Sequence, residues 1–241
     1  AGDNGVFTVA QFEAAIRAPR RAAPNTRMVV IEQTANHGRG RVWPLETVAA
    51  IGAAAARHGL VAHMDGARLL NACVASGVAA RTFAQHVDTV WLDLSKGLGC
   101  PIGGVLAGGA AFIEEAWRWK QRLGGAMRQA GVIAAAGLYA LDHHVERLAD
   151  DHAAARRFAD GIREAPGLRL ARDTVDSNIV IFDVVGTGLD AETFRTRLAA
   201  RGVRIGALSA TRLRAVTHLD VTSAQVENAA RAVRDVAAAT R

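Results

Sequence analysis

Patterns of apolar residues divide the first half of the chain into alternating strands and helices. Short apolar runs bounded by turn residues predict strands, and apolar residues recurring every three to four positions predict helices. Pro44 can open a helix at its first position, and Gly59 can end it. Thr8 and Gln11 have the spacing of a capping box. The predicted elements are a helix after Thr8, strands at 27–33, 60–65, 87–95 and 103–108, and helices at 44–59 and 68–74.

The second half begins with a long helical pattern, from Ala111 to about Ala165, which is interrupted at 123–131. Strands then predominate around two helices. We predict strands at 177–184, 203–205 and 213–218, and helices at 190–200 and 223–239. The early alternation of strands and helices predicts a mainly parallel sheet covered by helices. We therefore expect a three-layer α/β large domain at 1–125, and a connecting helix with a small α+β domain at 126–241.

Length and composition are typical of a globular chain. It has 241 residues, of which 50% are hydrophobic and 22% charged, so it can bury a substantial core. No uncharged apolar run approaches the roughly 18 residues of a membrane-spanning helix. The segment Ala1–Arg17 has neither a basic region nor an apolar run, and we therefore predict no secretory signal.

A net charge of +6 raises the alternative of a nucleic-acid-binding module. Most arginines are interleaved with acidic residues, and the one dense cluster, Arg17–Arg27, reads as a solvated connector. Binding to nucleic acid is therefore not expected. Cys73 and Cys100 lie far apart without metal-ligand spacing, which favours buried thiols in a reducing cytoplasm over a disulfide framework.

Lys96 ends an apolar strand and enters the glycine-rich turn of SKGLGCPIGG. Only two of the 29 Lys and Arg residues are lysines, Lys96 and Lys120. A dinucleotide fingerprint needs a helix after its glycines, whereas another strand follows here, and in a P-loop the lysine comes after the glycines. Two interpretations stay open. Lys96 either snorkels from a strand end, or it is a Schiff-base lysine whose neutral amine attacks a carbonyl, which a guanidinium cannot do.

Asp65 ends another buried strand, at the position where α/β sheets present ligand-binding groups. Taken alone it is a helix cap for the following segment. Taken with Lys96 it is a carboxylate that pairs with a pyridine nitrogen and deepens an electron sink. His63, two residues earlier, could supply half of a metal site with Asp65, but no further ligands have suitable spacing. No metal site is predicted.

Four motifs in this order resemble the low-specificity L-threonine aldolases: HMDGARLLNA, LSKGLGCPIGGVLAG, LGGAMRQAGVIAAAGLYAL and LRAVTHLDV. These enzymes form part of the β-eliminating lyase group of fold-type-I pyridoxal-phosphate enzymes. The similarity runs through essentially the whole chain. The stretch VIEQTANHGRGRVWPL also resembles the family, with Gln33 and Ala35 as looser matches.

The resemblance implies a role for five residues. Lys96 would form the Schiff base with pyridoxal 5'-phosphate, and Asp65 would hold the pyridinium nitrogen. Arg68 would lie at the cofactor's edge, near its phenolic oxygen or the substrate carboxylate. Arg128 would reach the cofactor region of a neighbouring subunit. Arg214 would bind the substrate α-carboxylate, for which a planar guanidinium is well suited.

The implied reaction is retro-aldol cleavage of L-threonine or L-allo-threonine to glycine and acetaldehyde. The implied assembly is a homodimer or homotetramer with active sites at subunit interfaces. Two alternatives stay open. One is a related lyase that performs β-elimination or acts on phenylserine-type substrates, and the other is a catalytically incompetent fragment or scaffold.

The chain departs from the family in two places. Family members are longer at the N-terminus by about a third of a chain, and that region normally supplies a Ser-Gly-Thr phosphate cradle and a histidine stacked on the ring. Where many relatives have a lysine before the LGG segment, this chain has Gln121, with Lys120 one position earlier. Cofactor binding by this chain alone is therefore the point that most needs testing.

Overall fold

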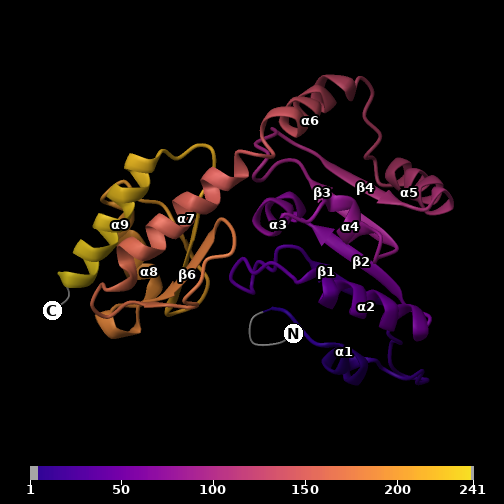
Figure 1. Cartoon of the computed structure of the whole chain (residues 1–241), viewed down its shortest axis with the longest axis horizontal. Helices are drawn as coiled ribbons and strands as arrows, with labels where there is room; N and C mark the ends of the chain where they lie inside the picture. Colours follow the sequence, from indigo (N-terminus) through magenta and orange to yellow (C-terminus); the bar gives the residue numbers. More distant parts are fainter. Residues whose placement is uncertain (1–4, 240–241) are drawn as a thin grey trace. The chain divides into compact units, whose positions relative to one another are not determined.

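The computed structural model describes residues 5–239 and divides into two compact units (Figure 1). Of the described residues, unit 1 comprises 5–38 and 42–148, and unit 2 comprises 39–41 and 149–239. Each unit has its own sheet and its own apolar core. The domain boundary predicted at 125/126 stays a prediction.

Unit 1 is built on a four-stranded sheet in the order β1-β2-β3-β4. The first three strands are parallel and β4 runs antiparallel to β3, so the predicted mainly parallel sheet is confirmed. The strands are β1 (Met28–Glu32), β2 (Val61–Gly66), β3 (Thr89–Asp93) and β4 (Gly104–Gly108). The helices are α1 (Val9–Ala15), α2 (Leu45–Arg57), α3 (Leu69–Ser76), α4 (Ala80–Ala84), α5 (Ala110–Arg122) and α6 (Gly131–His143).

The core of unit 1 lies on one face of this sheet. Side chains alternate between the two faces of a strand, and alternate residues such as Ile31 and Met64 are fully buried with Ile51 of α2. Met28 and Val30 point to the other face and are about half exposed. That second face presents apolar side chains at one end of the strands and polar ones at the other.

Helices α5 and α6 carry many exposed apolar side chains. None of the residues of α5 is buried, although Trp117 and Trp119 belong to it. Leu123 is 79% exposed and Val132 80%. Isolated exposed apolar residues are ordinary on protein surfaces, but a group of this size is not.

Unit 2 has an antiparallel sheet in the order β5-β6-β8-β7, packed against three helices. Phe182 of β6, Phe194 of α8 and Val233 of α9 are fully buried in its core. The strands are β5 (Arg169–Leu170), β6 (Ile179–Asp183), β7 (Gly206–Ala207) and β8 (Arg212–Val216). The helices are α7 (Leu148–Arg163), the 3-10 turn η1 (Val185–Thr187), α8 (Ala191–Ala199) and α9 (Ser223–Ala238).

Most predicted elements are confirmed, including the capping box of Thr8 with Gln11. The strand predicted at 203–205 is wrong. Val203 and Ile205 pack against the apolar core instead, and the strand forms at Gly206 and Ala207, which pair with β8. The elements α4, β5 and η1 were not predicted from the sequence, and neither was the break between α6 and α7.

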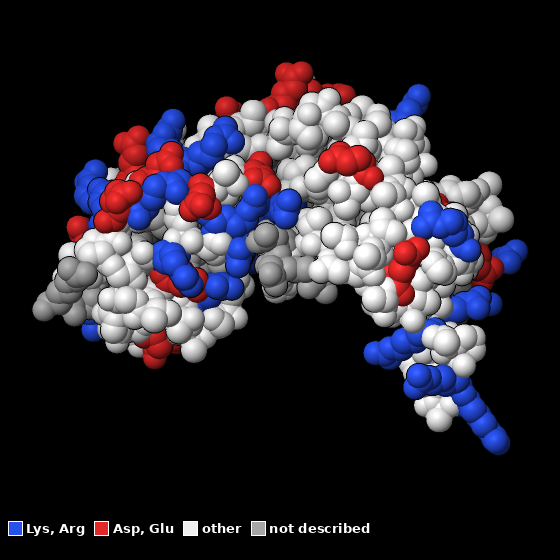
Figure 2. Space-filling model, turned by 60° about the horizontal axis from the view of Figure 1, so that its bottom comes forward, with Lys and Arg blue, Asp and Glu red and all other residues white. Residues whose placement is uncertain are grey.

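Within residues 5–239, no helix combines the length and the apolarity needed to cross a bilayer. On the face drawn in Figure 2, blue and red side chains lie interspersed at the left, whereas the lower-right end carries blue side chains without red ones. The arginines of the segment 17–27 are all exposed.

Candidate active site

The end of β3 folds back so that Lys96 meets Asp93. One oxygen of Asp93, Oδ1, accepts hydrogen bonds from the Ser95 backbone N–H at 2.7 Å and the Ser95 hydroxyl at 2.8 Å. This is the local turn that aspartate favours after a strand. The other oxygen, Oδ2, lies 2.7 Å from Lys96 Nζ. The Asp93 side chain is 6% exposed, whereas that of Lys96 is 38% exposed.

The tight turn after Lys96 explains why glycine is found there. The Gly99 N–H donates to the Lys96 carbonyl at 2.9 Å and closes a tight turn. Gly99 has φ +71°, a left-handed conformation that glycine adopts at little cost. The glycine-rich stretch is therefore the means by which the chain reverses from β3 into β4 while Lys96 stays at the strand end.

Opposing effects act on the pKa of Asp93. Burial raises it, but hydrogen bonds from Lys96 and Ser95 and the charge of Lys96 together lower it below its ordinary value. The carboxyl group is consequently ionised at neutral pH. A charged pair of a partly exposed amine and a buried carboxylate lies at the carboxyl end of β3.

Asp65 lies on the neighbouring strand, on the same face of the sheet. The strand register pairs it with Trp91, and the Lys96 ammonium lies over the Trp91 ring, 5.2 Å from its centroid. Asp65 Oδ1 also accepts the Ala67 N–H at 3.0 Å. The helix-cap interpretation of Asp65 is wrong, because α3 begins after Arg68 without a side-chain cap and Asp65 closes the turn before it. The role of Asp65 at the cofactor stays a prediction.

Gly66 lets β2 and β3 approach closely at this point. A Cβ atom at Gly66 would lie 2.2 Å from the carbonyl oxygen of Trp91, a distance that would force the backbone to move. A glycine after Asp65 is therefore required by the packing of the site.

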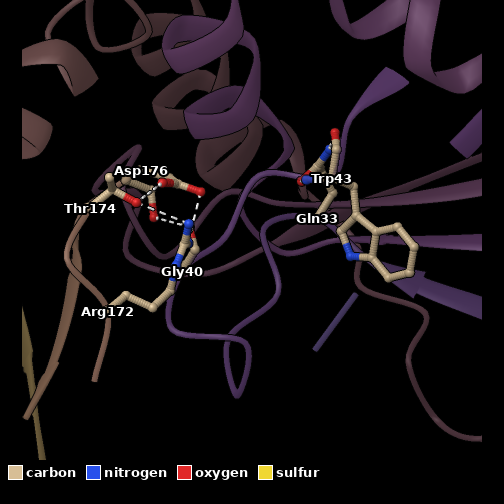
Figure 3. A network of polar contacts seen from close by, with 7 residues as sticks. Gln33, Gly40, Trp43, Arg172, Thr174 and Asp176 are labelled. Atoms are coloured by element: carbon tan, nitrogen blue, oxygen red, sulfur yellow. Dashed lines mark hydrogen bonds and ion pairs between the residues drawn. The ribbon is translucent and has the colours of Figure 1, made fainter. Parts of the chain in front are cut away.

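Arg68 and Gln33 connect the ends of β1 and β2. The Arg68 N–H donates to the Gln33 carbonyl at 2.8 Å, and the Gln33 N–H donates to the Asp65 carbonyl at 2.8 Å. The buried side-chain amide of Gln33 accepts from Trp43 N–H at 3.0 Å and donates to Trp43 O at 3.2 Å (Figure 3). Gln33, a looser match to the family, supports the strand end that carries Asp65.

Arg68 lies at the start of α3 and lines a small hollow together with Asn71 and Asp93. The structure thus places Arg68 in the same region of unit 1 as Asp65 and Lys96. His63 interacts with Thr89, with 2.8 Å between Nδ1 and Oγ1. Among residues 5–239, no group of His, Cys, Asp and Glu side chains is arranged to hold a metal ion.

Arg128 and Arg214 are not brought to this site by contacts that the structure shows. Arg128 lies exposed between α5 and α6, and its side chain has no hydrogen bond or ion pair with the described residues. Arg214 belongs to β8 of unit 2, opposite Ile181 of β6, and is partly buried. Their roles at the cofactor stay predictions.

Polar contacts in unit 2 fix the backbone around β6 and β8. Arg172 forms an ion pair with Asp176 at 2.9 Å and contacts Thr174 at 3.0 Å (Figure 3). Thr217 Oγ1 donates to the Asp151 carbonyl at 2.6 Å, and the Asn178 side chain donates to the Thr217 carbonyl at 2.9 Å. Through these contacts Thr217 helps to fix the end of the strand that carries Arg214.

Asp93 and Ser95 were not among the site residues predicted from the sequence. Their signal was present in the stretch DLSK: an aspartate three residues before the lysine and a serine two residues after the aspartate. An acid–lysine pair at this spacing directly after a strand predicts that the turn folds the two charges together.

A family model described as beta-eliminating lyase matches residues 1–185. Low-specificity L-threonine aldolase 1 of Arabidopsis thaliana is 37% identical over 227 residues, which cover 93% of this chain and 63% of that protein. Low specificity L-threonine aldolase of Escherichia coli K12 is 38% identical over 205 residues, which cover 85% of this chain and 59% of that protein. The chain therefore spans about three fifths of the length of these curated relatives.

The solved structure of a Leishmania major threonine aldolase matches with a TM-score of 0.77 at 18% identity and covers 97% of this chain and 68% of that one. At this identity the likeness shows the fold, and the predicted fold-type-I pyridoxal-phosphate enzyme fold is confirmed. The match of the family model over most of the chain, together with the identity to two curated aldolases, shows that the chain belongs to the beta-eliminating lyase family.

Proposed function

We propose that the chain forms part of a pyridoxal-phosphate-dependent lyase that cleaves L-threonine and L-allo-threonine to glycine and acetaldehyde. The observation that carries this proposal is the convergence of Lys96 and Asp65 beside Trp91 at one end of the sheet. The names of the Arabidopsis and E. coli relatives support the substrate class. The activity is assigned to the whole enzyme, of which this chain matches about three fifths of the relatives' length.

The residues present fit pyridoxal phosphate. Its aldehyde requires an amine, and its ring nitrogen requires a carboxylate that keeps the nitrogen protonated. Lys96 Nζ supplies the amine and Asp65 supplies the carboxylate, and both stand at the carboxyl ends of parallel strands, where α/β sheets bind ligands. When bound, the cofactor supplies an electron sink for the pair of electrons released as the Cα–Cβ bond breaks.

The arginines bind and orient the substrate. Arg214 holds the α-carboxylate with two parallel hydrogen bonds from its planar guanidinium, and this fixes which bond at Cα breaks. Arg68 lies at the cofactor's edge, which its place at the start of α3 supports. Arg128 reaches toward a second subunit, which its exposed place between α5 and α6 supports.

The enzyme is a homo-oligomer whose active sites lie at subunit interfaces. The exposed apolar side chains of α5, α6 and the segment between them support this, because a second copy that covers them removes a large apolar area from water. They are Phe112, Trp117, Trp119, Leu123, Met127, Val132, Leu138, Tyr139 and Leu141.

The enzyme works in the cytoplasm on a small amino acid. Cys73 and Cys100 are both free thiols, and burial raises the pKa of Cys73 to about 11. Unpaired thiols of low reactivity are typical of proteins in a reducing compartment.

The test is cleavage of threonine by the protein with added pyridoxal phosphate, followed by measurement of acetaldehyde and glycine. Lys96→Ala abolishes the activity, and the control Lys120→Ala keeps a much larger part of it, because the proposed reaction requires the amine of Lys96 and not that of Lys120. A Lys96→Ala protein with full activity contradicts the proposal. Rates with threonine, phenylserine and cysteine distinguish aldol cleavage of small substrates from the two related lyase activities.

A further inference from the structure

We propose that Asp93 is a positioning residue for Lys96: its buried carboxylate fixes the amine at the end of β3 and restrains the amine's reaction with aldehydes. This inference rests on the proposed function, in which Lys96 is the residue that reacts. It assigns a role to a residue that the family motifs do not include.

The geometry of Asp93 is that of a fixed partner. Its carboxylate is 6% exposed and accepts the two Ser95 hydrogen bonds on Oδ1, so that Oδ2 faces Lys96 Nζ at 2.7 Å. Exposed surface pairs contribute little because both side chains lose conformational freedom when they meet. Here the backbone turn has already immobilised one partner, and only Lys96 has to be ordered.

Lys120 provides a reference inside the same chain. The ammonium groups of both lysines lie over tryptophan rings, Lys96 over Trp91 at 5.2 Å and Lys120 over Trp117 at 4.6 Å. Among the described residues, only Lys96 of the two has a carboxylate at ion-pair distance. A difference in reactivity between them therefore reports on Asp93 more than on the neighbouring ring.

The chemical consequence concerns the proton of the amine. Attack on an aldehyde carbon needs the nitrogen lone pair, which an ammonium group lacks, and an adjacent carboxylate favours the ammonium form. Asp93 is a poor acceptor for that proton because contacts with Lys96 and Ser95 outweigh burial and hold its pKa low. The proton therefore leaves to solvent water, which reaches Lys96 because its side chain is 38% exposed.

Other charged or titratable groups surround the pair on each packed element. Burial and the charge of Asp93 raise the pKa of the Cys100 thiol, which keeps that group neutral. The groups around the pair are Asp65 on β2, Arg68 at the start of α3, Cys100 in the same loop and His144 at the end of α6. An Asp93→Asn variant replaces none of these groups and removes one charge, although it also takes away the part of the Cys100 pKa rise that comes from the Asp93 charge.

The experiment is competitive reductive methylation with formaldehyde and cyanoborohydride, with both lysines quantified in one digest by mass spectrometry. It is run between about pH 7 and pH 10, the range in which lysine amines begin to lose their protons. The proteins are the unmodified chain, Asp93→Asn, Ser95→Ala and the control Asp183→Asn, which removes an equally buried, paired carboxylate in unit 2.

We expect Asp93→Asn to raise the ratio of Lys96 to Lys120 methylation about three- to tenfold near neutral pH, because the ion pair with Asp93 no longer holds the amine. Ser95→Ala loosens Asp93 and shifts the ratio in the same direction by less. Asp183→Asn leaves the ratio unchanged. An unchanged or lower ratio in folded Asp93→Asn overturns the role of Asp93.

A parallel sample receives pyridoxal phosphate and borohydride in place of formaldehyde. An unmodified chain without a pyridoxyl group on Lys96 contradicts the proposed function. The methylation ratio needs no cofactor, so it tests Asp93 separately and the two failures are distinguishable.

Discussion

Two carboxylates, one in each unit, are buried to the same extent but pair with different cations. Asp93 in unit 1 and Asp183 in unit 2 are each 6% exposed, and their cations, Lys96 and Arg212, are 38% and 36% exposed. Asp183 receives two hydrogen bonds from Arg212, at 2.9 and 3.0 Å. Asp93 receives a single contact from Lys96 at 2.7 Å.

The two cations suit different tasks: Arg212 can only stabilise the fold, whereas the amine of Lys96 can also react. Arg212 is locked in a planar two-point contact, and the hydrogen bond from its guanidinium to Asp183 raises its pKa further, so its charge is permanent. Lys96 can lose its proton, and it stands beside Trp91 and Asp65 at the carboxyl end of a parallel strand. Only two of the 29 Lys and Arg residues are lysines, and one of them stands where the proposed reaction requires an amine.

The largest effect is expected when Lys96 is replaced by arginine. Lys96→Arg keeps the positive charge next to Asp93 but removes the amine, and we expect threonine cleavage to fall by more than ~10³-fold. Folding should be nearly unchanged. Acetaldehyde release and thermal unfolding measure the two effects, and a substantial residual rate would show that Lys96 acts through its charge alone.

The second largest effect is expected in acid, where unit 2 should lose stability through a buried histidine. His152 on α7 is 2% exposed, and burial with the nearby charge of Arg156 lowers its pKa to about 4. The unfolded chain then binds the proton first, so this stability is complete above about pH 6.5 and declines as the pH falls toward 4, by about 3 kcal/mol. His152→Gln should flatten this decline.

Hydrogen exchange of β6 and β8 measures the decline in unit 2. Trp43, Trp91, Trp117 and Trp119 all belong to unit 1, so tryptophan fluorescence follows unit 1 separately. Equal acid sensitivity of His152→Gln and the unmodified chain would contradict the buried neutral histidine.

Removing each carboxylate compares the two pairs directly. Asp183→Asn leaves Arg212 and the nearby Arg169 without their counter-ion, and we expect a loss of roughly 2–3 kcal/mol of unfolding free energy. Asp93→Asn costs less, about 1–2 kcal/mol, because the Ser95 bonds can persist to the amide oxygen. Denaturant unfolding measures both losses.

The pH dependence of the Asp93 effect has a definite sign. Because the folded-state pKa of Asp93 is lowered, its contribution is present above its unfolded-state pKa of about 4 and disappears as the pH falls below that value. The difference between the unmodified chain and Asp93→Asn should therefore shrink in acid. A difference that grows in acid would contradict the ionised carboxylate.

The smallest expected effect comes from Arg212→Lys. A lysine can keep the charge next to Asp183 but makes one contact in place of two, and we expect a loss of about 1 kcal/mol. Lys96 labelling should not change, because the residue lies in the other unit. A change in labelling would show that the structural pair also influences the chemistry.

Much of the fold followed from local patterns, because apolar periodicity, capping and glycine positions act over a few residues. The capping box at Thr8 and the parallel strands around Met64 illustrate this. Short elements were missed where tertiary contacts decide. The two-residue strand β7 exists only through its pairing with β8, and Val203 and Ile205 follow the core instead of the strand pattern.

The site stays a prediction, but the structure shows how two of its residues are arranged. Lys96 and Asp65 were identified from the sequence, and the strand register brings them to the same end of the sheet. Asp93 was missed because its significance depends on a turn that folds Ser95 and Lys96 back onto it. The roles of Arg128 and Arg214 at the cofactor stay predictions, because the contacts among the described residues do not bring them to Lys96 and Asp65.

The central claim is that one amine of this chain bonds covalently to the aldehyde of pyridoxal phosphate. The most direct measurement is borohydride reduction of the protein with pyridoxal phosphate, followed by digestion and mass mapping of the two lysine peptides. We expect a pyridoxyl group on Lys96 and little on Lys120. A chain labelled equally on both lysines, or only on Lys120, would contradict it.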